Sequence, residues 1–216
     1  MRVVVGMATF KGREKAVDLA CRSLSKQVDI IYLYDNEQNE DLTDNGKFYG
    51  LELEKEPCIY LSCDDDLNYP PDYVENMVKG IEKHNSIVSH HGRILSGLDV
   101  SYYHGHKSWR CLDEVRAWQR LDVCGTGVTA FSTEYFNPVL WNAEDKKMSD
   151  LVFSLEAIKQ GKIITLLPHS KGWIKHLPIA HSKSIAVTER NNTRQIELAN
   201  EIYNIRYGNQ ITKDSE

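Results

Sequence analysis

In the first hundred residues, short β-branched runs alternate with segments whose apolar residues are spaced as on one face of a helix. This alternation constrains the fold more than any other feature of the chain. Apolar runs at 2–8, 30–34 and 58–62 have the length and composition of buried strands. Between the first two, residues 15–28 place apolar side chains at the spacing of one helix face. Strand, helix and strand in this order predict parallel strands with helices packed on both faces. The sequence therefore predicts an α/β fold with a Rossmann-like, mostly parallel sheet flanked by helices.

The rest of the chain continues the alternation less regularly. We expect helices after Pro70-Pro71-Asp72, at 149–160 and at 188–207, and strands at 87–89, 123–132 and 163–167. Ser149 can cap the second of these helices, and Gly161 can end it. Residues 92–120 have no firm period, so we expect loops or an irregular hairpin there.

Polar side chains directly follow three of the expected strands. They are Thr9, Asp35 and the run Asp64-Asp65-Asp66. Ligands of open α/β sheets bind in the crevice beyond the carboxyl ends of the strands. We therefore expect these three groups to converge on one ligand-binding crevice.

Three adjacent aspartates at a strand end repel one another, and solvent or a cation must compensate for this repulsion. Aspartate and phosphate oxygens are hard ligands that suit Mg²⁺ or Mn²⁺. Alternate residues of an extended segment share a face, so Asp64 and Asp66 can point together while Asp65 diverges, unless the chain turns. The triplet is thus a candidate metal site, although acidic loops without a metal are common.

The chain carries a net charge of −5 that is unevenly distributed. Residues 1–105 are acidic, whereas residues 146–194 hold many more Lys and Arg than Asp and Glu. This basic segment also contains His169, His176 and His181. It can attract an anionic substrate or form a solvated surface, and the sequence favours neither.

Bulk composition predicts a single globular unit in the cytoplasm. No apolar run approaches the roughly 18 to 20 residues needed to cross a bilayer, and the run 3–6 is too short for a signal-peptide core. The five cysteines are odd in number and form no Cys-x-x-Cys pair, which argues against a disulfide framework and against a zinc ribbon. We expect reduced, mostly buried thiols.

Residues 60–74 read YLSCDDDLNYPPDYV, and this segment resembles the Asp-x-Asp strand end and Tyr-Pro-x-Asp helix start of the family 2 glycosyltransferases, which have the GT-A fold. The likeness extends more loosely to residues 5–13 and to Asp35, and covers roughly residues 1–175. It implies a GT-A-like domain over 1–210 and a frayed tail over 211–216. The domain would comprise a nucleotide-sugar-binding half (1–105), an acceptor and catalytic half (106–187) and a C-terminal helix (188–210).

The resemblance implies a metal-dependent, inverting glycosyltransferase that uses Mn²⁺ or Mg²⁺ and a nucleotide-sugar donor, with a UDP-sugar expected. Asp66 would bind the metal directly, with His176 completing the shell, and Asp64 or Asp65 would share the metal or the donor's ribose. Asp150, at the start of the helix at 149–160, would be the general base, with Glu144 or Asp145 as substitutes. The expected donor-binding residues are Thr9, Arg13, Asp35, Asp64, Asp65, Gly125, Gly127 and Lys175.

Other functions remain open at this stage. A nucleotidyltransferase acting on a sugar phosphate would need a basic, Gly-rich phosphate loop, of which Lys11-Gly12-Arg13 is a thin version. A nucleic-acid-binding protein would use residues 146–194 and the aromatic residues Trp109, Trp118 and Trp173. The acceptor of a glycosyltransferase would be a saccharide, a lipid-linked sugar or, less commonly, a modified DNA base.

Overall fold

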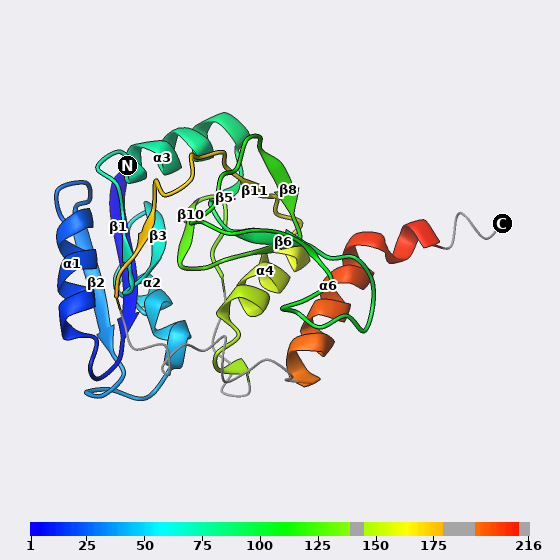
Figure 1. Cartoon of the computed structure of the whole chain (residues 1–216), viewed down its shortest axis with the longest axis horizontal. Coiled ribbons are helices and arrows are strands. Elements are labelled where there is room, and N and C mark those ends of the chain that lie inside the picture. The colour runs from blue at the N-terminus through cyan, green and yellow to red at the C-terminus, as the bar shows by residue number, and fades with distance from the viewer. Residues whose placement is uncertain (139–144, 179–192, 212–216) are drawn as a thin grey trace.

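Seven strands in the order β2-β1-β3-β10-β5-β11-β8 form the central sheet of the computed structural model, which describes residues 1–138, 145–178 and 193–211 (Figure 1). Their bounds are β1 Arg2–Thr9, β2 Ile30–Asp35, β3 Cys58–Asp64, β5 Ile87–Ser89, β8 Gln119–Leu121, β10 Val128–Ser132 and β11 Ile164–Leu166. β1 pairs in parallel with β2 and β3, and β5 pairs in parallel with β11, whereas β10 and β8 are antiparallel to their neighbours. Five of the seven strands therefore share one direction, which confirms the expected mostly parallel sheet.

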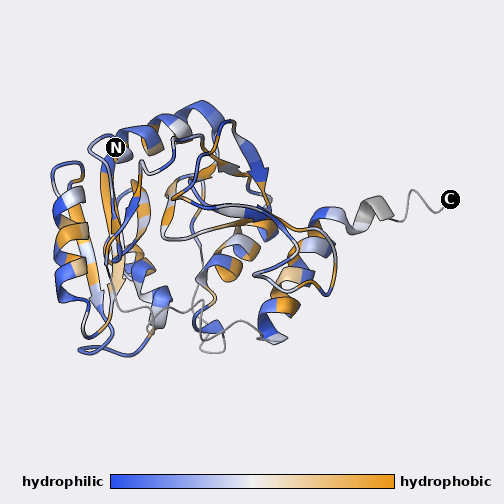
Figure 2. Ribbon diagram, in the orientation of Figure 1, coloured by the Kyte–Doolittle hydropathy of each residue, from blue (hydrophilic) through white to orange (hydrophobic). Residues whose placement is uncertain are grey.

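Helices cover both faces of the sheet, as the strand and helix order predicts. Helices α1 (Glu14–Leu24) and α3 (Tyr73–His84) cover one face, and the 3₁₀ helix η1 (Thr43–Phe48) and α4 (Ser149–Lys159) cover the other. Side chains of β1 alternate between the two cores. Val5 and Met7 pack in the core that holds α1 and α3, whereas Val4 packs in the core that holds Phe48 and Phe153. Figure 2 shows the central strands as mostly hydrophobic and the helices as two-sided.

The segment at 92–120 contains an irregular hairpin, one of the two forms expected there, because β6 (Gly92–Ile94) and β7 (Lys107–Trp109) pair antiparallel. Together with β9 (Val123–Cys124), these strands form a small antiparallel sheet. The expected strand at 123–132 is therefore divided into β9 and β10, because β9 pairs with β6 while β10 pairs with β3 and β5. The turn between them, residues 125–127, contacts Asp64 and Asp150, which line the cleft described below.

The ends of the expected helices agree with the structure only in part. Ser149 does not cap α4, since Met148 occupies that position and Ser149 is the first helical residue. Gly161 does follow the end of α4, with φ of +68°. Helix α6 (Thr193–Ile211) packs on α4, whereas residues 188–192 and 212–216 lie outside the described residues.

A short helix and a two-stranded sheet lie outside the central sheet. Helix α2 (Gly50–Leu53) follows η1, and strand β4 (Leu67–Asn68) pairs with β12 (Lys175–His176). This pairing brings a segment from late in the chain against the acidic run at 64–66. Within the described residues, no helix combines the length and apolarity that crossing a membrane requires.

Candidate active site

A cleft of about 320 Å³ lies beyond the carboxyl ends of β1 and β3, where the sequence predicts a ligand site. Segments from η1, from the acidic run, from residues 91–103 and from the start of α4 contribute to its lining. Of the residues predicted from the sequence, Arg13, Asp64, Asp65, Asp66 and Asp150 line this cleft. The fold therefore brings the strand-end carboxylates and the start of α4 together.

Asp65 is held by groups that follow the first strand. Its carboxylate accepts a hydrogen bond from Thr9 Oγ1 at 2.8 Å and pairs with Arg13 Nη1 at 2.5 Å. Burial raises the pKa of Asp65, although the Arg13 charge and the Thr9 hydrogen bond favour its ionised form. Gly12, with φ of +81°, makes the turn that leads to Arg13. Thr9, Arg13 and Asp65 thus form one buried unit at the strand ends.

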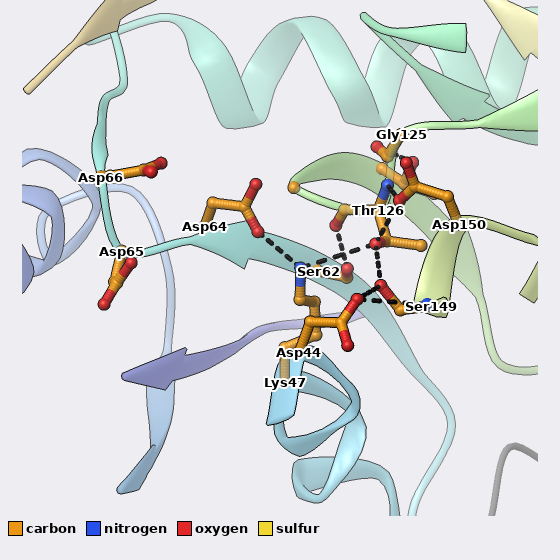
Figure 3. Close-up of polar contacts among 12 residues, drawn as sticks. Asp44, Lys47, Ser62, Asp64, Asp65, Asp66, Gly125, Thr126, Ser149 and Asp150 are labelled. Atoms are coloured by element: carbon orange, nitrogen blue, oxygen red, sulfur yellow. Dashed lines mark hydrogen bonds and ion pairs between the residues drawn. The ribbon is translucent and has the colours of Figure 1, made fainter. Parts of the chain in front are cut away.

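Asp64 turns to the opposite side and pairs with a buried lysine (Figure 3). Its Oδ1 lies 2.5 Å from Nζ of Lys47, which also donates to Thr126 Oγ1 at 3.5 Å. Gly127 lies directly against this carboxylate, because a Cβ there would approach Asp64 Oδ2 to 1.9 Å. Burial lowers the pKa of Lys47, but the Asp64 and Asp44 carboxylates outweigh it, and the pKa is raised overall. Lys47 is therefore a charged ammonium at neutral pH.

Asp66 lies beside His176, as the pairing of β4 with β12 requires. Asp66 Oδ2 is 3.7 Å from His176 Nε2, and the backbone N–H of Leu177 donates to the carbonyl of Asp66 at 2.7 Å. Burial and the neighbouring Asp64 and Asp65 carboxylates raise the pKa of Asp66 to about 6. A cation bound next to Asp66 would offset this excess of negative charge.

These residues fit a divalent cation that is completed by its substrate. Among the residues that the structure describes, no three His, Cys, Asp or Glu side chains are grouped as a metal site. Asp66 and His176 offer one oxygen and one nitrogen, while Asp64 is paired with Lys47. Mg²⁺ and Mn²⁺ sites commonly use one or two protein ligands together with substrate phosphates and water. The donor set therefore suits an ion that takes its remaining ligands from water or from a bound substrate.

Asp150 is fixed in the cleft by three hydrogen bonds. Its Oδ1 accepts from the backbone N–H and the hydroxyl of Thr126, both at 2.7 Å, and its Oδ2 accepts from Tyr102 Oη at 2.9 Å. Burial opposes ionisation, yet the pKa of Asp150 is lowered, because His91, the Thr126 hydrogen bonds and the Lys47 charge favour the carboxylate. Oδ2 keeps a second lone pair that can accept a proton from a hydroxyl.

A second buried carboxylate, Asp44 of η1, ties this helix to the start of α4. Its Oδ2 accepts from the Ser149 backbone N–H at 3.1 Å and from the Ser149 hydroxyl at 2.5 Å. The Ser149 hydroxyl also contacts Thr126 Oγ1 at 2.8 Å. Burial raises the pKa of Asp44, while Lys47 and Ser149 oppose this effect. Asp44, Ser149 and Thr126 thus connect Lys47 to Asp150 through side chains (Figure 3).

Other predicted residues lie near the cleft without lining it. Asp35 ends β2 beside Thr9, but its carboxylate accepts from the Glu37 backbone N–H. Lys175 is exposed on β12, and Gly125 packs against the ring of His91. Asp145, a substitute for the base, is buried and pairs with Arg194 at 2.8 Å. Glu144 and His181 lie outside the described residues.

Sequence reasoning missed several residues that the fold brings to the cleft. They are Asp44, Lys47, His91, Arg93, Tyr102 and Thr126. Lys47 is the only Lys or Arg between positions 27 and 54, so a lone cation in an acidic stretch was the available signal. Arg93 and Tyr102 belong to a segment without periodicity, and only the tertiary fold brings them to the same cleft as the acidic run.

The comparisons with known proteins concern the fold. The chain is similar to A197 from STIV over 83% of its length and 87% of that chain, at 13% identity and a TM-score of 0.50. It resembles S. aureus TarS 1–349 over 98% of its length and 73% of that chain, at 15% identity and a TM-score of 0.45. The inositol-1-phosphate CTP transferase from T. maritima matches over 91% of this chain and 75% of its own, at 13% identity and a TM-score of 0.38. No protein-family model matches the sequence, and no curated protein matches it either.

Proposed function

We propose that this chain is a metal-dependent, inverting glycosyltransferase that moves a sugar from a nucleoside-diphosphate sugar to an acceptor hydroxyl. One observation carries the proposal: the strand-end carboxylates Asp64, Asp65 and Asp66 face the same cleft as Asp150 at the start of α4. A donor diphosphate with its cation suits the first group, and deprotonation of an acceptor suits Asp150. The resemblance of residues 60–74 to the family 2 glycosyltransferases supports the same reading.

At the donor end, each aspartate has its own role. Asp66 and His176 would hold Mn²⁺ or Mg²⁺, which would offset the charge of the leaving diphosphate when it is bound. Asp65, fixed by Thr9 and Arg13, would receive the hydroxyls of the nucleotide ribose. Asp64, held by Lys47 over Gly127, would stay turned toward the transferred sugar. Asp35, Gly125 and Lys175 would complete the donor site from its rim.

At the other end, Asp150 would take the proton of the acceptor hydroxyl as that oxygen attacks the anomeric carbon. Its lowered pKa keeps it ionised in the free protein, and desolvation by bound substrate would raise its affinity for the proton that it takes. The Thr126 hydrogen bonds occupy Oδ1 and so direct Oδ2 toward the reacting hydroxyl. Attack from the face opposite the diphosphate would invert the anomeric centre.

A panel of nucleoside diphosphates and nucleotide sugars tests the proposal. We expect calorimetric binding of UDP and hydrolysis of a UDP-sugar that both depend on added Mn²⁺ or Mg²⁺, are lost with a chelator and return with excess metal. Asp66→Ala should abolish both the metal-dependent binding of UDP and the hydrolysis of the UDP-sugar. Glu75→Ala removes an exposed carboxylate of α3 and should match the wild type. Metal-independent turnover by Asp66→Ala would contradict the assignment.

A nucleotidyltransferase is the alternative that the same assay separates, because it would release pyrophosphate from a nucleoside triphosphate and a sugar phosphate. The geometry gives it little support, since Arg13 of the thin phosphate loop is committed to Asp65. A nucleic-acid-binding function would appear as DNA affinity that falls steeply with salt, without nucleotide-sugar binding. Part of the basic segment that motivates it, residues 179–192, lies outside the described residues.

A further inference from the structure

Arg93, on strand β6, is a cation of the cleft that the donor site does not use. Arg13 and Lys47 pair with Asp65 and Asp64, whereas no carboxylate within residues 1–138, 145–178 or 193–211 lies at ion-pairing distance from Arg93. The residue is half-buried, so its charge is partly removed from water. A cation in this position favours a negatively charged ligand.

The guanidinium of Arg93 is held in place before any ligand arrives. Its central carbon lies 4.2 Å from the centroid of the Tyr102 ring, and its Nη1 donates to Tyr102 Oη at 2.8 Å. Tyr102 itself is buried, with 5% of its surface exposed. Stacking and this hydrogen bond fix the planar fork and leave its other N–H groups for a ligand. A preorganised guanidinium loses little entropy when it binds an anion.

The same tyrosine connects Arg93 to the proposed base. Tyr102 Oη accepts from Arg93 and donates to Asp150 Oδ2 at 2.9 Å. An anionic group on Arg93 would therefore lie next to the carboxylate that receives the acceptor's proton. Tyr103, whose ring packs edge-on against that of Tyr102, and Lys147 also line the cleft.

We propose that the acceptor is an anionic saccharide, one that carries a phosphate or a carboxylate close to its reacting hydroxyl, and that Arg93 recognises this group. The inference rests on the proposed function, because it takes the Asp150 end of the cleft as the acceptor site. A carboxylate or a phosphate matches the fork of the guanidinium in the same way, with two parallel N–H···O bonds. The ring of the acceptor would pack beside Tyr103.

Calorimetric titration of UDP-saturated protein with three sugars tests this proposal. Glucose 6-phosphate carries a phosphate, glucuronate carries a carboxylate, and methyl glucoside carries no charge. We expect one of the two anionic sugars to bind at least about tenfold more tightly than methyl glucoside, the effect of a charge-assisted hydrogen bond. The stronger of the two identifies the anionic group.

Substitution of Arg93 assigns this preference to one side chain. Arg93→Met should lower the affinity for the preferred anion about tenfold and change that for methyl glucoside by less than about twofold. Arg93→Lys keeps the charge without the planar fork, so its affinity for the preferred anion should lie between those of the wild type and Arg93→Met. Arg120 is an exposed arginine of β8 outside the cleft, so Arg120→Met is the matched control and should bind like the wild type. Circular dichroism of each variant checks that it is folded.

Two results would overturn the inference: equal affinity of the wild type for the three sugars, or an equal loss for charged and neutral sugars in Arg93→Met. The second result would give Arg93 only the structural role of holding Tyr102. Failure of the proposed function is a separate result, since it would appear as no binding of UDP by the wild type. Repeating the titration on nucleotide-free protein reads the Arg93 preference in that case as well.

Discussion

Nζ of Lys47 lies 2.5 Å from Oδ1 of Asp64, and the two residues differ sharply in exposure. The lysine side chain is 5% exposed, whereas 42% of the aspartate side chain faces the cleft. Lys47 therefore pairs with Asp64 Oδ1 from the protein interior, while a large part of the Asp64 side chain stays exposed to the cleft. The charge of Lys47 also acts on Asp44 and Asp150, which makes it the common counter-charge of three carboxylates.

Lys47→Met should destabilise the protein, because Asp44 and Asp64 would lose their nearest cation. Removing one partner of a fully buried pair costs several kcal/mol, and the exposure of Asp64 reduces this to about 2 kcal/mol. Urea unfolding at pH 7.5 measures the loss. Lys159→Met breaks a surface pair with Glu201, whose partners are 47% and 43% exposed, and should cost less than about 1 kcal/mol. Equal losses in the two variants would contradict the role given to Lys47.

Gly127→Ala should distort the donor site, because the added Cβ would meet Oδ2 of Asp64 at 1.9 Å. Either the turn or the aspartate must move, at a cost of about 1–3 kcal/mol in stability. We expect weaker binding of UDP with Mn²⁺ in the same variant, measured by calorimetry. At Gly97 a Cβ would meet nothing within 4 Å, so Gly97→Ala should leave both quantities near the wild-type values. Unchanged UDP binding in Gly127→Ala would show that Asp64 does not contribute to the donor site.

The sequence predicted the fold in its regular part because strand and helix periodicity survive in a single sequence. Residues 2–8, 30–34 and 58–62 alternate with helices and became β1, β2 and β3, each slightly longer than expected. The turn at residues 125–127 was read as the beginning of a strand, since periodicity does not reveal that β9 and β10 belong to different sheets. Strand pairing depends on contacts between residues that are far apart in the sequence.

The candidate site was predictable where it follows strand ends and invisible elsewhere. Asp64, Asp65 and Asp66 stand out as a run, and Thr9 joins them because parallel strands end at one edge. Lys47 lies in a 3₁₀ helix, which has no strong sequence signature. Its contact with Asp64 spans 17 residues, and only the packing of η1 against the sheet creates it.

His90 should make stability depend on pH, because its imidazole is fully buried and neither ring nitrogen has a hydrogen-bond partner among the described residues. Burial and the facing His169 lower its pKa to about 3, and Tyr73 and Trp173 pack around it. The unfolded chain, with a histidine pKa of about 6.5, binds a proton that the folded chain excludes. Stability attributable to His90 is therefore lost as pH falls below about 6.5.

His90→Phe removes this proton and keeps the aromatic shape. We expect the variant to be at least as stable as the wild type at pH 7.5. The difference in free energy of unfolding between the variant and the wild type should be about 2 kcal/mol larger at pH 5.0 than at pH 7.5. Urea unfolding at the two pH values measures the difference. Other titrating groups, including His91 with its pKa lowered to about 4, are shared by both proteins and cancel. Parallel pH profiles would show that His90 is not the group responsible.

Asp150→Asn should lower kcat by about a hundredfold or more, because the amide cannot accept the acceptor's proton. UDP affinity should persist, since the hydrogen bonds of Asp150 go to Thr126 and Tyr102, whereas Thr9 and Arg13 bind Asp65. Asp145→Asn is the informative comparison. Asp145 also lies shortly before α4 in the sequence, but it is paired with Arg194 and does not line the cleft. We expect its turnover to match the wild type, and a loss of turnover in Asp145→Asn without one in Asp150→Asn would move the general base to Asp145.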